Sequence, residues 1–146
     1  MIVPSGVLFD LDGVIFQGDR LIPGAEGVIH KLQIAKIPYR FITNTTRMTK
    51  YNLINMLSKM GFSVNPKEIF AAPHAASEYC KLKRYKNISL IVPDEEMKED
   101  FSTFQFVDEN PEAIVVGDMG KLFTFELLNR LFLNIINGAE LIAMHK

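Results

Sequence analysis

Short apolar runs alternate along this chain with longer segments in which apolar residues recur every three or four positions. The short runs predict β-strands at residues 7–9, 39–42, 69–71, 88–92, 113–116 and 141–143. The longer segments predict helices that contain residues 28–36, 53–60, 75–83 and 123–136. A small hairpin with a polar tip is expected at residues 14–22. Because strands and helices alternate, the pattern predicts an α/β fold with a mostly parallel sheet.

Two of these elements carry an expectation about their surroundings. The first strand, Val7-Leu8-Phe9, is apolar at every position, which is typical of a strand buried on both faces. The helix at residues 123–136 is predicted to be amphipathic, and its apolar face carries Phe125, Leu128, Leu131, Phe132 and Ile135.

Composition and charge exclude several classes of protein. The 146 residues are 48% hydrophobic and 23% charged, which is the range of globular proteins and not of disordered chains. A net charge of -1 argues against a broad basic surface for nucleic acid. No apolar run approaches the roughly 20 residues that span a bilayer, and the first residues lack the basic start of a secretory signal. Cys80 is the only cysteine, so a reducing compartment fits best. The chain is therefore predicted to be cytoplasmic, with no nucleic-acid or membrane partner.

Two carboxylates directly follow the first strand. Asp10 and Asp12 are separated by one residue, and Gly13 permits a tight turn beside a ligand. The carboxyl ends of parallel strands form the usual ligand crevice of an open α/β sheet. A hard cation such as Mg²⁺ offsets two close carboxylates, an aspartate can accept a phosphoryl group, and a second aspartate can move protons. The alternative is that Asp10 caps a turn and that Asp12 is a solvated side chain.

A second polar cluster follows the strand at residues 39–42. Thr43 and Asn44 could hold phosphate oxygens at the same edge as Asp10 if the two strands are neighbours. The alternative is a helix N-cap, for which Asn44, Thr45 and Thr46 are all suitable. Asp118, which follows the apolar run at residues 113–116, could bind a metal or form a turn.

These residues resemble the signatures of a known family. Residues 8–14, Leu-Phe-Asp-Leu-Asp-Gly-Val, resemble the first signature of the haloacid dehalogenase-like (HAD) hydrolases. Residues 41–46, Phe-Ile-Thr-Asn-Thr-Thr, resemble the second signature in the NagD-like and para-nitrophenylphosphatase-like subfamily. The similarity continues through residues 23–25, 125–132, 138–143 and 145–146 and so runs along essentially the whole chain.

The resemblance implies a fold and a function. Residues 1–71 would be the N-terminal half of a Rossmann-like HAD core, and residues 72–146 would be part of an α/β cap domain. The implied activity is Mg²⁺-dependent hydrolysis of a small phosphorylated metabolite through an aspartyl-phosphate. Asp10 would be the nucleophile, and Asp12 would be the general acid and base. The phosphate would be bound by Asp12, Gly13, Thr43 and Asn44, and the metal by Asp10 and by the backbone carbonyl of Asp12.

The family pattern also extends past the point equivalent to Lys146. Its third signature, a lysine, and its fourth, an acidic loop, are not found in these residues. We therefore expect the 146-residue chain to be truncated and weakly active or inactive alone, so whether it is an enzyme by itself stays open. The alternatives are a catalytically degenerate remnant that acts as a binding or interaction module, and a small flavodoxin-like phosphate-binding domain.

The resemblance gives one further expectation, about the first strand. In the family this strand is central in the core sheet, so in this chain it would lose a neighbour. An unpaired edge of an apolar strand promotes association. We therefore predict a homo-oligomer or another pairing that covers this edge, or a rearranged sheet.

Overall fold

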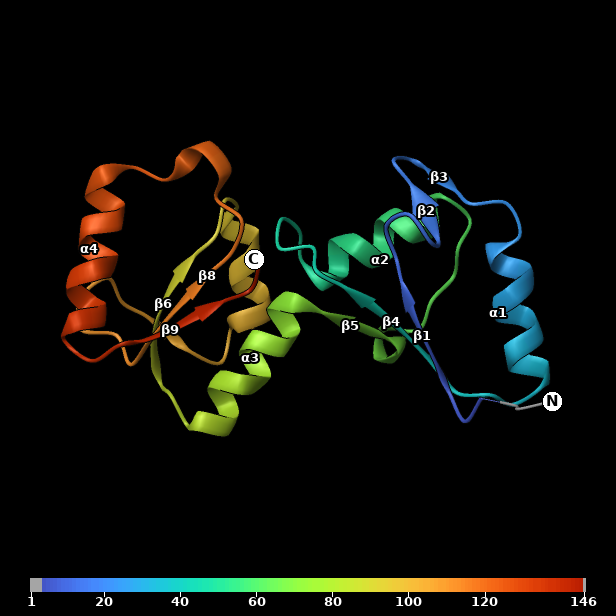
Figure 1. The fold of residues 1–146 in the computed structure, drawn as a ribbon, viewed down its shortest axis with the longest axis horizontal. Coiled ribbons are helices and arrows are strands. Elements are labelled where there is room, and N and C mark those ends of the chain that lie inside the picture. The colour runs from blue at the N-terminus through green and yellow to red at the C-terminus, as the bar shows by residue number, and fades with distance from the viewer. Residues whose placement is uncertain (1–3, 146) are drawn as a thin grey trace. The chain divides into compact units, whose positions relative to one another are not determined.

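The computed structural model describes residues 4–145, which form two compact units (Figure 1). The first unit comprises the residues up to Thr43 together with Lys50–Ala71. The second comprises Asn44–Thr49 together with the residues from Ala72 onward. Each unit contains helices and a parallel sheet of its own, so the predicted α/β class with parallel sheets is confirmed.

The first unit is built on a three-stranded sheet. Its strands are β1 (Val7–Asp10), β4 (Tyr39–Thr43) and β5 (Ile69–Ala71), which are parallel and lie in the order β1-β4-β5. Strands β2 (Phe16–Gln17) and β3 (Arg20–Leu21) form the predicted hairpin. The helical elements are α1 (Ala25–Ile34), α2 (Lys50–Lys59) and the short 3₁₀ helix η1 (Pro66–Glu68).

One face of this sheet carries the core of the first unit. Phe41 is 1% exposed, and its ring lies 5.6 Å from the rings of Tyr39 and Phe62 and 6.1 Å from that of Phe9. Helix α2 contributes the buried pair Leu53 and Leu57, one helical turn apart. Aromatic contacts therefore fix β1, β4 and the residues after α2 around a single ring.

The other face of this sheet is open. Leu8 is 67% exposed, Ile42 38% and Phe70 47%, and the register places Leu8 beside Arg40 and Ile42 beside Phe70. The expectation that the first strand is buried on both faces is therefore wrong. The physical reason is that side chains alternate between the two faces of a strand, and in the described residues only one face is buried.

Strand β1 is also an edge strand. In the described part of the chain it pairs with β4 alone, so the alternative of a rearranged sheet is wrong. That another chain covers the outer edge stays a prediction. If it does, the amides of residues 7–10 that point away from β4 should exchange with deuterium at least about tenfold more slowly than the outward amides of β5.

Residue-resolved hydrogen exchange of the pure chain measures this difference. The outer edge of β5 is the internal control, because β5 also pairs only with β4 in the described residues. Equally fast exchange at both edges, at every protein concentration, would contradict a covered β1 edge.

The second unit contains a four-stranded parallel sheet in the order β7-β6-β8-β9. The strands are β6 (Asn87–Ile91), β7 (Gln105–Phe106), β8 (Ala113–Val116) and β9 (Glu140–Ala143). The helical elements are α3 (Ala72–Lys83), α4 (Phe125–Ile136) and the 3₁₀ helices η2 (Glu95–Phe101) and η3 (Gly120–Leu122). Strand β7 and helix η2 are additions to the elements predicted from the sequence.

Both faces of this second sheet carry packed side chains. Ala113 and Val115 pack with Cys80 of α3 and Phe101 of η2, whereas Ile114 packs with Leu131 of α4. Successive residues of β8 therefore point to α3 on one side and to α4 on the other. In the described residues, no helix is long and apolar enough to cross a membrane.

Helix α4 is only partly used by this core. Thr124 caps it by accepting a hydrogen bond from the Leu127 amide at 3.1 Å. Of the five apolar residues expected on one face, only Leu131 is buried, whereas Phe125 is 80% exposed. Most of the apolar surface of α4 therefore faces away from the sheet that it covers.

Candidate active site

The two carboxylates lie in a tight loop at the carboxyl end of β1. The Leu11 carbonyl accepts hydrogen bonds from the amides of Ile15 and Phe16 at 2.9 and 3.1 Å, and Gly13 has the positive φ of 77° that this turn requires. Leu11 is fully buried, whereas Asp10 and Asp12 on either side of it are exposed. The buried leucine therefore anchors the loop and leaves both carboxylates on its solvent side.

The orientation of Asp10 is fixed locally. Its Oδ1 atom accepts a hydrogen bond from the Leu11 amide at 2.8 Å. Asp12 forms an isolated bridge with Phe16, which closes the loop. An oriented carboxylate with a second carboxylate two residues later is an arrangement that phosphoryl transfer through an aspartate can use.

Thr43 reaches the same edge of the sheet as Asp10. In the parallel register Asp10 pairs with Ile42, so Thr43 is the next residue at the end of the neighbouring strand. Neighbouring strands lie about 4.8 Å apart, so the structure brings Asp10 and Thr43 to one edge. Thr43 is partly buried.

Asn44 begins a segment that belongs to the second unit. Residues 44–49 pack there through Thr46, which is 2% exposed and whose hydroxyl accepts a hydrogen bond from the Asp118 amide at 2.9 Å. The alternative that Asn44, Thr45 or Thr46 caps the next helix is wrong, because α2 begins only at Lys50. Thr46 anchors the segment instead of capping a helix.

Asp118 is engaged by the same segment. Its Oδ2 atom accepts from Arg47 Nε at 3.0 Å and lies 2.8 Å from an Arg47 terminal nitrogen, while Oδ1 accepts from the Gly120 amide at 3.0 Å. The Asp118 carboxylate therefore stabilises a turn and forms an ion pair. This agrees with the alternative that Asp118 belongs to a turn. Sequence reasoning missed the Thr46–Arg47–Asp118 contact because its partners lie about 70 positions apart and no local pattern links them.

The donors at this edge fit part of a magnesium site. Mg²⁺ is commonly held by one or two carboxylates together with waters and substrate phosphate oxygens, and Asp10 and Asp12 offer such carboxylates. Within residues 4–145 there is no group of three or more His, Cys, Asp or Glu side chains that could hold a metal ion. At this edge of the sheet, the described residues thus supply two carboxylates for a metal ion and no third.

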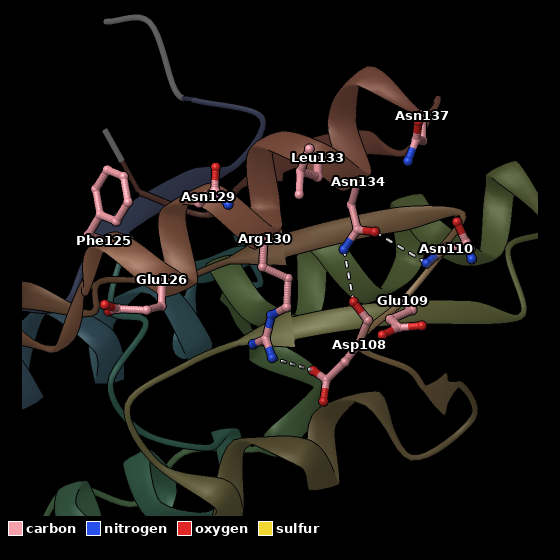
Figure 2. A pocket seen from close by; sticks show the side chains of 10 residues that line it. All are labelled: Asp108, Glu109, Asn110, Phe125, Glu126, Asn129, Arg130, Leu133, Asn134 and Asn137. Carbon is pink, nitrogen blue, oxygen red and sulfur yellow. Dashed lines mark hydrogen bonds and ion pairs between the residues drawn. The ribbon is translucent and has the colours of Figure 1, made fainter.

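A separate pocket of about 540 Å³ lies in the second unit, between α4 and residues 108–110. Figure 2 shows Arg130 and Asn134 reaching from α4 toward this loop. Asn134 donates to the Asp108 carbonyl at 2.9 Å and accepts from the Asn110 amide at 3.2 Å, and Arg130 lies 3.5 Å from the Asp108 carboxylate. These contacts hold the loop against the helix, so the polar side chains that line the pocket stabilise the packing of this loop on α4.

A cluster around Glu140 is structural in the same way. Glu140 accepts hydrogen bonds from the hydroxyls of Tyr79, at 2.6 Å, and of Tyr85, and it lies 3.6 Å from the Lys83 ammonium. The hydrogen bond from Tyr79, followed by that from Tyr85, lowers the pKa of Glu140. The cluster ties the start of β9 to α3 and the residue shortly after it.

Comparison with known proteins supports the resemblance found in the sequence. The family model described as haloacid dehalogenase-like hydrolase matches residues 7–107. The chain is 35% identical over 144 residues to haloacid dehalogenase-like hydrolase domain-containing protein 2 of Rattus norvegicus, which covers 99% of this chain and 54% of that protein. The chain spans about half the length of the curated relatives that it matches.

Solved structures share the fold. The 4-nitrophenylphosphatase of Thermotoga maritima superimposes with a TM-score of 0.85 at 25% identity, over 97% of this chain and 54% of that one. NagD from E. coli K-12 gives a TM-score of 0.84 at 22% identity, over 98% of this chain and 57% of that one, and shows the fold alone. The predicted NagD-like, para-nitrophenylphosphatase-like relationship is confirmed, and this chain belongs to the haloacid dehalogenase-like hydrolase family.

Proposed function

We propose that this chain carries the phosphoryl-accepting half of a Mg²⁺-dependent phosphatase that acts on a small phosphorylated metabolite. The observation that supports the proposal most directly is the placement of Asp10, Asp12 and Thr43 at the carboxyl edge of two neighbouring parallel strands. Ligands of open α/β sheets bind at this edge.

The proposed reaction has two steps. In the first, a carboxylate oxygen of Asp10 attacks phosphorus, the bond between phosphorus and the ester oxygen breaks, and Asp12 gives its proton to the leaving oxygen. In the second, Asp12 takes a proton from a water molecule whose oxygen attacks phosphorus. The bond from Asp10 to phosphorus then breaks, which releases inorganic phosphate and restores both carboxyl groups.

The remaining residues bind and orient the phosphate. Thr43 offers a hydroxyl at the end of β4, and Gly13 lets the backbone approach the phosphate without a side chain. Asn44 is proposed to add its amide. The Asp10 carboxylate and the Asp12 backbone carbonyl would hold Mg²⁺, which would supply positive charge that neutralises the phosphate oxygens.

The catalytic activity that we propose for the 146-residue chain by itself is weak. The sheet edge supplies two carboxylates, whereas the family pattern adds a third-signature lysine and a fourth-signature acidic loop, and neither signature is found in this sequence. We therefore propose weak activity for the 146-residue chain. A catalytically degenerate module is the second candidate, favoured by the open sheet face and the exposed apolar side of α4.

Beryllium fluoride tests the phosphoryl-accepting role without requiring turnover, because with Mg²⁺ it imitates a phosphorylated aspartate. We expect saturating Mg²⁺ and beryllium fluoride together to raise the melting temperature of the first unit by at least about 4 °C, since a ligand that binds only the folded state stabilises it. Differential scanning calorimetry measures the shift.

The matched control is a second exposed aspartate of the same unit. Asp10→Asn should abolish the shift, and Asp19→Asn, in the polar tip between β2 and β3, should leave it unchanged. A chain that shows no joint effect of Mg²⁺ and beryllium fluoride is the degenerate module and not the phosphatase half.

A further inference from the structure

Helix α4 exposes an apolar stripe that the fold of its own unit does not use. Phe125, Leu128, Phe132 and Ile135 follow one another at intervals of three, four and three residues, and they are 80%, 50%, 57% and 36% exposed. We call these four residues the α4 stripe. Side chains at such spacing line one side of a helix, which is the pattern that packs against a second helix.

The surroundings of the α4 stripe argue for a protein partner and against a lipid surface. Leu133 and Ile136, at 46% and 60% exposure, widen the apolar side. The only charged residues of α4 are Glu126 and Arg130, and Figure 2 shows Phe125 and Arg130 projecting from different sides of the helix. A helix that binds a membrane surface normally carries several lysines and arginines on its polar side.

The spacing of the stripe further favours one particular partner. Phe125 and Ile135 lie five positions on either side of residue 130, and Leu128 and Phe132 lie two positions on either side of it. When two identical helices pack antiparallel about this centre, Phe125 faces Ile135 and Leu128 faces Phe132. A two-fold interface requires a patch that is complementary to itself.

We infer that α4 is a dimerisation helix, which pairs antiparallel with α4 of a second copy of this chain. The six exposed apolar side chains of α4 offer roughly 600 Å², taking roughly 200 Å² for a fully exposed side chain of this size. A standard interface buries about 800 Å² on each partner, so α4 supplies most of what a dimer needs.

Sedimentation velocity of the 146-residue chain, from about 1 to about 200 µM, tests the pairing. We expect a monomer–dimer equilibrium that Leu128→Glu and Phe132→Glu each weaken by about 100-fold or more, since each buries a charge against apolar side chains. Both residues are exposed in the single chain, so the variants should keep their folded circular dichroism spectra.

The control is Leu82→Glu, which changes a 79% exposed leucine on α3 of the same unit and should leave the dimer intact. A chain that is monomeric at every concentration would overturn the inference, and its α4 would then be free for a different protein. A dimer that survives both α4 changes, or binding to anionic vesicles through α4, would overturn it as well.

Cross-linking tests the antiparallel arrangement independently. Leu128 should face Phe132 of the partner subunit, so the double variant Leu128→Cys, Phe132→Cys should form disulfide-linked dimers under mild oxidation. The double variant Leu82→Cys, Tyr79→Cys on α3 should not. The native Cys80 does not interfere, because it is buried and burial raises the pKa of its thiol to about 11. Equal cross-linking of both double variants would contradict the proposed pairing.

Discussion

The 146-residue chain should hydrolyse 4-nitrophenyl phosphate at least about 100-fold more slowly than a full-length 4-nitrophenylphosphatase of the same family. One preorganised charged group at a phosphoryl-transfer site is worth about this factor, and the proposed site here is supplied by Asp10, Asp12 and Thr43 without a third acidic ligand in the described residues. Steady-state release of 4-nitrophenol with saturating Mg²⁺ measures the difference.

Substitutions show whether any remaining turnover belongs to the proposed site. Asp10→Asn should reduce it to the uncatalysed background, because an amide cannot accept the phosphoryl group. Asp19→Asn should have no effect, since that side chain is 94% exposed in the hairpin. Turnover within about tenfold of the full-length enzyme that is lost in Asp10→Asn would show that the chain is a complete catalyst.

Replacing Phe41 by alanine should cost the first unit about 3–5 kcal/mol of unfolding free energy. Phe41 is 1% exposed and its ring contacts Phe9, Tyr39 and Phe62, so its removal leaves a cavity that three aromatic side chains cannot easily fill. Urea denaturation followed by far-ultraviolet circular dichroism measures the change.

Phe70 provides the matched control, because it lies on the neighbouring strand β5 but is 47% exposed on the open face of the same sheet. Phe70→Ala should cost less than about 1 kcal/mol. If both alanine variants were destabilised equally, the open face would be buried in solution, and the sheet would have two packed faces instead of one.

The sequence predicted the elements well where local patterns are strong. The apolar run before Asp10 and the run at residues 39–42 form neighbouring parallel strands. Short apolar runs that are separated by a helical segment favour such βαβ units. The two-residue strand β7 and the 3₁₀ helix η2 were not predicted, since β7 is too short to show a pattern and Glu95–Phe101 has only two apolar residues, Met97 and Phe101, among five charged ones.

Burial was predicted less well than element type. Leu8 and Phe125 are apolar and were expected on packed faces, yet both are largely exposed. A local pattern identifies an apolar face but does not say whether anything covers it. That depends on which other elements the fold places opposite, and Phe125 with its exposed neighbours on α4 is the basis of the dimer inference.

The amino-acid order alone determined the family, the α/β class and the place of the two carboxylates after the first strand, because these depend on short-range spacing and on a recognisable signature. Only the tertiary structure decided that Thr46 and Arg47 engage Asp118, that the first sheet has one open face, and that α4 turns most of its apolar side outward. Those features depend on which residues far apart in the chain come into contact and which do not, and neither outcome leaves a local trace in the sequence.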